Sequence, residues 1–72
     1  MSIEPAADAT TAFEAERPRL AALAYRMLGT PDDADDVVQD AWLRWSAADR
    51  GSVHDERAYL VTITSRLALD RL

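Results

Sequence analysis

The sequence predicts an all-α domain, a small bundle in which three principal helices share one core. Three observations favour this class. Apolar residues recur at spacings of three and four in three segments, and the breaks between these segments carry helix-capping residues. The third is the length of 72 residues, which allows one domain with a thin core. Because the chain has no cysteine to form disulfides, its stability has to come from helix packing or from a partner.

The first helix is expected to begin near Thr10 or Thr11. Thr11 and Glu14 have the spacing of a capping box, in which each side chain binds the backbone N–H of the other residue. Pro18 removes one backbone hydrogen bond, so it should kink the helix or mark the start of its well-ordered part. Gly29 supplies the left-handed residue that ends the helix. The apolar positions on its inner face are Phe13, Leu20, Leu23, Ala24, Met27 and Leu28.

The second helix has the clearest start signal in the chain. Thr30 can serve as its N-cap, and Pro31 fits the first helical position, where a missing N–H costs nothing. Asp32 and Asp33 follow in the first turn, where the positive end of the helix dipole favours carboxylates. The helix should run to about Asp49. Its apolar positions, with both tryptophans interpreted as core, are Ala34, Val37, Val38, Ala41, Trp42, Trp45 and Ala48.

Residues 49–55 interrupt the helical period and contain a glycine, so they are expected to form a loop. Asp55, or alternatively Ser52, can cap a third helix that begins near Glu56. The β-branched run at 61–64 favours a strand on its own, but the apolar spacing of the whole segment favours a helix. The residues that set this spacing are Leu60, Ile63 and Leu67, with Val61, Ala68 and Leu72 beside them.

The chain ends and the apolar runs bear on its class. Residues 1–9 are small, polar and aperiodic and are interpreted as a flexible leader, which leaves residues 10–72 as the folded domain. The helical pattern is still running at Leu72, so we expect a fragment of a longer protein. The longest apolar run, at 20–25, is far shorter than the roughly 20 residues that span a bilayer. Because no signal peptide is recognisable either, a cytoplasmic protein with no membrane contact is expected.

The net charge of −5 is unusual for a nucleic-acid binder, but the charges are unevenly distributed. Residues 30–40 contain five aspartates and no basic residue, whereas residues 57–72 contain three arginines and one aspartate. The acidic and the mildly basic surfaces therefore belong to different segments.

Little in the sequence points to catalysis. The single histidine, His54, lies in a loop and is interpreted as an ordinary exposed residue. Asp32, Asp36 and Asp40 share one helical stripe that can in principle hold a hard cation, but a solvated acidic face is the favoured interpretation. We therefore expect no enzyme, no metal and no cofactor.

Leu43 lies about 100° round the second helix from Trp42, on the side that carries Asp36, Gln39 and Asp40. An apolar residue ringed by polar ones is typical of a partner surface. A single exposed leucine is also common, so both interpretations stay open on composition alone.

These residues resemble region 2 of the sigma-70 family. Its most recognisable stretch has an acidic residue followed by two aliphatic residues, a glutamine and then a glutamate or aspartate, with an aromatic residue shortly after. The corresponding residues here are Asp36, Val37, Val38, Gln39, Asp40 and Trp42. Residues 17–20 and 24–29 resemble the first helix of the extracytoplasmic-function (ECF) members, and residues 57–60 and 66–72 resemble the helix that melts and reads the promoter −10 element. The match covers residues 11–72 in the family's order. It is closest to a subgroup with an additional C-terminal ketosteroid-isomerase-like domain.

The resemblance implies a transcription initiation factor domain with two binding surfaces. One docks on the clamp helices of the largest subunit of core RNA polymerase, through Asp36, Gln39, Asp40, Leu43 and Arg44. The other faces the non-template strand of the −10 element, through Arg57, Tyr59, Thr62 and Arg66 on the third helix and a base-selecting loop of Asp49, Arg50, Gly51, Ser52, Val53 and His54. Tyr59 fits a core position equally well.

Two departures from the family pattern limit what carries over. Thr62 and Arg66 stand where many members have arginine and asparagine, so a base-by-base promoter preference does not transfer. The basic stretch that usually follows the third helix, and the C-terminal region 4, are not in the 72 residues. An anti-sigma factor or a regulatory domain of the same chain is a further possible partner. The rival interpretations are a helical protein-protein interaction module that binds no nucleic acid and, more remotely, a hydrolase fragment that uses the aspartates.

Overall fold

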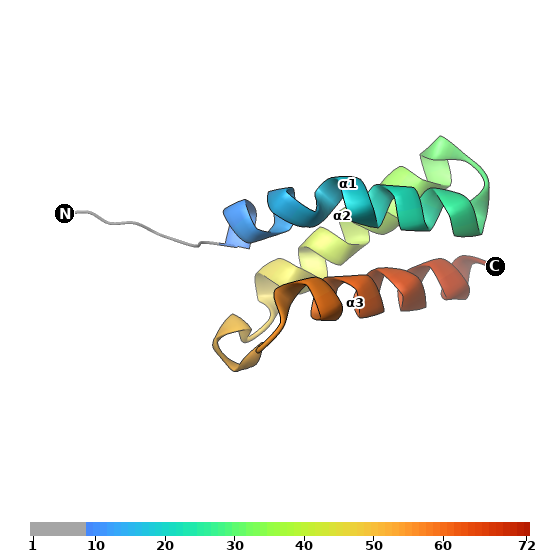
Figure 1. Cartoon of the computed structure of the whole chain (residues 1–72). Coiled ribbons are helices and arrows are strands. Elements are labelled where there is room, and N and C mark those ends of the chain that lie inside the picture. The colour runs from blue at the N-terminus through green and yellow to red at the C-terminus, as the bar shows by residue number, and fades with distance from the viewer. Residues whose placement is uncertain (1–8) are drawn as a thin grey trace.

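The computed structural model describes residues 9–72, which fold into three α-helices and one short 3₁₀ helix (Figure 1). The helices are α1 (Ala9–Leu28), α2 (Pro31–Ala47) and α3 (Glu56–Arg71), and the 3₁₀ helix η1 (Arg50–Ser52) lies between α2 and α3. No strand occurs in this part of the chain. The predicted all-α class with three principal helices is confirmed.

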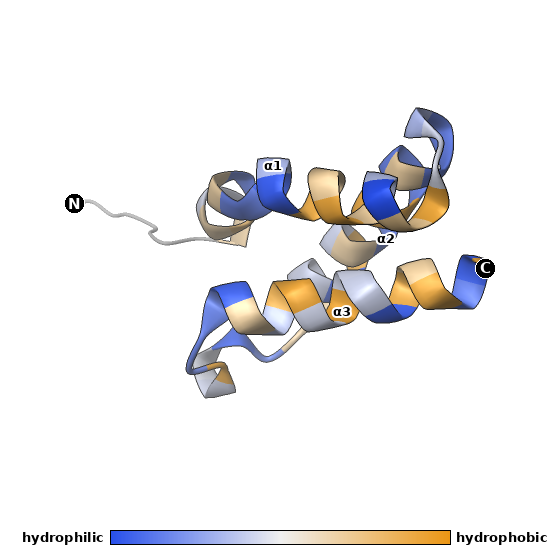
Figure 2. Ribbon diagram, turned by 45° about the vertical axis from the view of Figure 1, so that its right-hand side comes forward, coloured by the Kyte–Doolittle hydropathy of each residue, from blue (hydrophilic) through white to orange (hydrophobic). Residues whose placement is uncertain are grey.

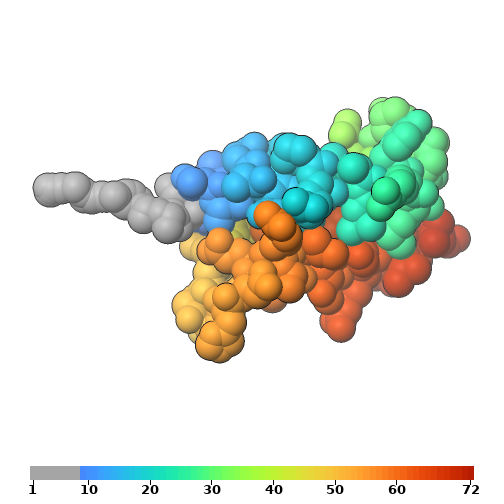
Figure 3. All heavy atoms as spheres, in the orientation of Figure 1, coloured from blue at the N-terminus to red at the C-terminus, as the bar shows by residue number. Residues whose placement is uncertain are grey.

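Each helix packs against the other two. In Figure 1, α1 and α3 lie in front and α2 crosses behind them. Figure 3 shows α1 and α3 side by side in the same view, where they cover most of α2. None of the helices in residues 9–72 combines the length and apolar character needed to cross a membrane.

The predicted start of α1, near Thr10 or Thr11, lies within two residues of the observed bound, but the predicted capping box is wrong. The helix already includes Ala9, so Thr11 lies inside it and cannot act as the N-cap of a capping box with Glu14. A tertiary contact lies at this end of the helix: the indole N–H of Trp45 donates to the carbonyl of Ala9 at 2.9 Å and joins α1 to α2. The rest of the predicted leader, residues 1–8, lies outside the described residues.

Pro18 does not interrupt α1, which is continuous from Ala9 to Leu28. The carbonyl that loses its partner belongs to Glu14. Both residues are exposed, so water can satisfy this carbonyl.

The remaining caps are those that the sequence predicts. Gly29 has the left-handed φ of 85°, and its N–H donates to the carbonyl of Tyr25 at 2.8 Å. The hydroxyl oxygen of Thr30 accepts from the N–H of Asp33 at 3.2 Å, and Asp55 accepts from the N–H of Ala58 at 3.0 Å. α2 ends at Ala47, two residues before the predicted end.

The core is made by the inner faces of all three helices, as the hydropathy colouring of Figure 2 shows. Its buried members are Phe13, Leu20, Ala24, Ala34, Val37, Val38, Ala41, Trp45, Leu60, Thr64 and Ala68. Trp42 is half-buried and packs edge-on against Phe13, with ring centroids 5.4 Å apart.

The predicted inner face of α3 needs a correction. The fully buried stripe is Leu60, Thr64 and Ala68, whereas Ile63 and Leu67 are only half-buried. α3 contacts both other helices, so the stripe that faces the bundle axis is buried most, and Ile63 and Leu67 lie to the α2 side of it.

Candidate functional site

The outer face of α2 presents a group of polar residues around one exposed leucine. Leu43 is 54% exposed, and Asp36 and Gln39 are exposed beside it. Asp40 is half-buried on the same face. Because the buried stripe of α2 occupies the opposite side, these four residues can meet a partner without any change in the core. We call them the docking face.

α3 reaches this docking face at its C-terminal end. The guanidinium of Arg71 forms ion pairs with Asp33 at 3.6 Å and with Asp36 at 3.7 Å. All three side chains are at least 36% exposed, so the pairs stabilise the fold only slightly. Asp36 on the docking face therefore has Arg71 as a partner within the fold.

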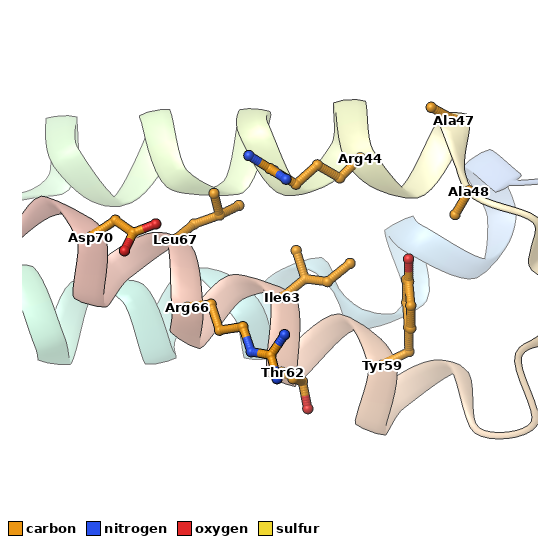
Figure 4. A pocket seen from close by; sticks show the side chains of 9 residues that line it. All are labelled: Arg44, Ala47, Ala48, Tyr59, Thr62, Ile63, Arg66, Leu67 and Asp70. Carbon is orange, nitrogen blue, oxygen red and sulfur yellow. The ribbon is translucent and has the colours of Figure 1, made fainter.

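Arg44, the fifth residue predicted for polymerase binding, points in another direction. It lines a groove of about 700 Å³ between α2 and α3 (Figure 4). The other lining residues are Ala47, Ala48, Tyr59, Thr62, Ile63, Arg66, Leu67 and Asp70. Arg44 therefore lines the same groove as three residues that are predicted to bind DNA: Tyr59, Thr62 and Arg66.

The floor of the groove is apolar and partly aromatic. Ile63 and Leu67 project toward α2, and Tyr59 stands at the end nearest the loop (Figure 4). The ring of Tyr59 also packs against Trp45, with centroids 5.6 Å apart and planes tilted by 52°. Tyr59 therefore contributes to the core and also lines the groove, and its contact with DNA stays a prediction.

Most polar side chains of the predicted base-selecting loop are occupied by the fold. Asp49 accepts from the N–H of Gly51 at 3.2 Å, and the hydroxyl of Ser52 donates to the carbonyl of Asp49 at 2.9 Å. Arg50 donates to the carbonyls of Trp45 and Ser46, both at 3.0 Å, and so caps the end of α2.

The last two loop residues differ from each other. Val53 is half-buried and packs against the core. His54 is exposed, and it is the polar side chain of the loop that makes no hydrogen bond within the described residues. Of the predicted base-selecting loop, His54 is thus the side chain most available to a ligand.

Arg57 has a partner that sequence reasoning missed. Its Nε donates to Oε1 of Glu16 at 3.1 Å, across 41 positions of the chain. The Glu16 side chain is only 14% exposed and also accepts from Arg19 at 3.3 Å. Glu16, Asp55 and Glu56 line the shallow pocket beside Arg57, so this region is less favourable for a phosphate than the isolated charge of Arg57 suggests.

The acidic residues of α2 form no metal centre. In residues 9–72, no group of three or more potential ligands is arranged to hold an ion. Asp33 binds the Thr30 hydroxyl at 3.0 Å at the start of the helix, and Asp36 pairs with Arg71. The arrangement is that of a capped helix start with a solvated face.

Residues 12–72 match the family model for sigma-70 region 2, and the chain belongs to this family. Region 2 is the sigma factor domain that binds core RNA polymerase and recognises the −10 promoter element. The family assignment confirms the predicted class and the expectation of a non-enzymatic domain.

Two curated relatives resemble the chain at the sequence level. It is 53% identical over 60 residues to the ECF RNA polymerase sigma factor SigJ of Mycobacterium tuberculosis, a match that covers 83% of the chain and 19% of the relative. It is 43% identical over 63 residues to the probable ECF RNA polymerase sigma factor SigI of the same species, with coverages of 88% and 22%. The chain thus spans about a fifth of the length of these relatives. No solved structure matches it significantly.

Proposed function

We propose that the chain acts in transcription initiation as the part of an ECF sigma factor that docks on the polymerase clamp and captures the melted −10 element. The observation that carries this proposal is the separation of two surfaces on α2. The docking face, with Leu43 at its centre, looks away from the core, and the groove with Tyr59 and Arg66 opens between α2 and α3. Because the surfaces do not overlap, both partners can bind at once.

In this proposal the docking face binds the clamp helices of the largest polymerase subunit. Leu43 supplies an apolar anchor, and Gln39, Asp36 and Asp40 supply hydrogen bonds and charge around it. An apolar centre with a polar rim is the usual construction of a protein interface. A cytoplasmic location follows from this role, and an anti-sigma factor or a regulatory domain of the full-length protein is a further possible partner of the same faces.

The non-template strand of the −10 element is proposed to lie along α3 and the loop. Single-strand binders combine stacking platforms with basic side chains that follow the backbone. Tyr59 offers the platform, Thr62 and Arg66 lie one and two turns further along the same side of α3, and His54 lies in the preceding loop. Arg57 requires release from Glu16 before it can bind phosphate.

The docking face is tested by the double variant Gln39→Ala with Leu43→Ala. Both residues are exposed, so the helical circular dichroism should not change, whereas affinity for bacterial core polymerase should fall by about 1–2 kcal/mol or more. Affinity is measured by titration of fluorescently labelled chain with core enzyme.

Tyr25→Ala is the matched control, because Tyr25 is 50% exposed on α1 and lies outside both surfaces. It should leave core affinity unchanged. If the double variant binds core polymerase as well as the parent does, the docking face is wrongly assigned. If the parent does not bind core polymerase at all, the alternative of a helical interaction module without this partner gains support.

A further inference from the structure

The basic residues of this chain are all arginines, and most of them have partners in the fold. Carboxylates pair with Arg17, Arg19, Arg57 and Arg71, and backbone carbonyls hold Arg50. Within residues 9–72, the arginines that make neither an ion pair nor a hydrogen bond are Arg26, Arg44 and Arg66.

Two of these unpaired arginines, Arg44 and Arg66, line the same groove from opposite helices (Figure 4). Arg44 extends from α2 over the floor made by Ile63 and Leu67, and Arg66 lies along α3 beside Thr62. Two positive charges on one groove repel each other unless an anion joins them. Asp70 lies at the end of the groove away from Tyr59 and forms no ion pair with either arginine.

The groove therefore changes in character along its length. Tyr59 and Ile63 make one end aromatic and apolar, and Arg44 and Arg66 place positive charge next to it. A single-stranded nucleic acid presents the complementary sequence of groups, a flat apolar base followed by an anionic phosphate. The volume of about 700 Å³ lies in the range of pockets that hold small organic groups.

We propose, on the basis of the function proposed above, that Arg44 binds the promoter and not the polymerase. Arg44 and Arg66 hold one phosphate of the non-template strand from both sides, while the neighbouring base lies against Tyr59 and Ile63. The last turns of α2 then serve both partners, with the polymerase on the docking face and the DNA strand on the side that carries Arg44.

The test uses the chain assembled with bacterial core polymerase and a fluorescein-labelled, short single-stranded DNA of randomised sequence. The assembly should bind this DNA more tightly than core polymerase alone. Arg44→Ala and Arg66→Ala should each weaken binding by about tenfold, the size of one charge-assisted contact. Each should also lower the slope of log affinity against log salt by about 0.7, the value for one phosphate of a single strand.

Two variants serve as controls. Arg26→Ala removes an exposed, unpaired arginine of α1, and it should alter neither the DNA affinity nor the salt slope. Arg44→Lys keeps the charge but loses the planar fork of donors, so it should retain the salt slope with a smaller loss of affinity. Core affinity should be the same for Arg44→Ala and the parent.

The outcomes separate this proposal from the one on which it rests. If Arg44→Ala weakens core binding and leaves DNA affinity intact, Arg44 is a polymerase contact and the proposal is overturned, while −10 recognition stands. If Arg44→Ala changes neither affinity, Arg44 contacts neither partner and the proposal is again overturned. If the parent assembly binds single strands no better than core alone, the proposed function itself fails.

Discussion

Thr64 is the buried polar side chain of this core, and its hydroxyl has no hydrogen-bond partner within residues 9–72. A hydroxyl that is buried without a partner loses its hydrogen bonds to water and gains none in the protein, which lowers the free energy of unfolding. Thr64 is nevertheless fully buried on α3, the helix that packs against both α1 and α2.

Thr64→Val is therefore expected to raise the free energy of unfolding by about 1 kcal/mol, because valine keeps the shape and removes the unsatisfied group. Urea denaturation followed by far-UV circular dichroism measures the change. Thr62→Val, an exposed site on the same helix, is the control and should stay within about 0.5 kcal/mol of the parent. A lower stability for Thr64→Val would show that the hydroxyl has a partner such as a buried water.

At the scale of the elements, the loop between α2 and α3 contains one side chain that fixes its shape and another that is exposed. Arg50 holds the loop to the end of α2 through two carbonyl hydrogen bonds and lies over the ring of Trp45 at 5.7 Å. His54 is exposed and free of such bonds. The first residue fixes the shape of the loop, and the second is available to a base.

These two residues should respond differently to substitution. Arg50→Ala should lower the free energy of unfolding by about 1 kcal/mol through loss of the cap. His54→Ala should leave stability within about 0.5 kcal/mol of the parent but change the ranking of −10 bases, with one base contact worth about 1–3 kcal/mol. Transcription from single-base −10 variants, together with urea titrations, distinguishes them. An unchanged base ranking for His54→Ala would remove it from the site.

The elements also show which features the sequence can predict. The caps at Gly29, Thr30 and Asp55 were predictable because each depends on residues within four positions. The contact of Trp45 with Ala9 and the pairing of Arg57 with Glu16 were not, because these contacts span 36 and 41 positions. The direction of Arg44 depends on where α3 packs, which periodicity within α2 does not specify.

On the scale of the whole molecule, charge and shape set the conditions for DNA binding. The chain carries a net charge of −5, and within residues 9–72 two arginines without internal partners, Arg44 and Arg66, line the same groove. The docking face and the aspartates at the start of α2 repel a duplex that approaches from that side. In the proposed function, core polymerase therefore has to open the duplex and hold the melted non-template strand against α3.

The isolated chain is accordingly expected to bind duplex DNA poorly, with a dissociation constant no tighter than the non-specific range of about 10⁻⁴ to 10⁻⁶ M, because few arginines displace counterions. Fluorescence anisotropy with a labelled promoter duplex, at two salt concentrations, measures this. The same titration with core polymerase present provides the comparison. Tight, salt-resistant duplex binding by the chain alone would contradict the proposal that the polymerase opens the duplex and this chain binds the melted strand.

Trp45, a residue of the core, can report on its surroundings through its fluorescence. The indole of Trp45 contacts α1 through Ala9, the loop through Arg50 and α3 through Tyr59. The chain has two tryptophans, so in a Trp42→Phe variant all intrinsic tryptophan emission comes from this junction. Capture of a base against Tyr59 and detachment of the first turn of α1 would each change the polarity and quenching around that indole. Local unfolding of the isolated chain can thus be followed without an attached dye.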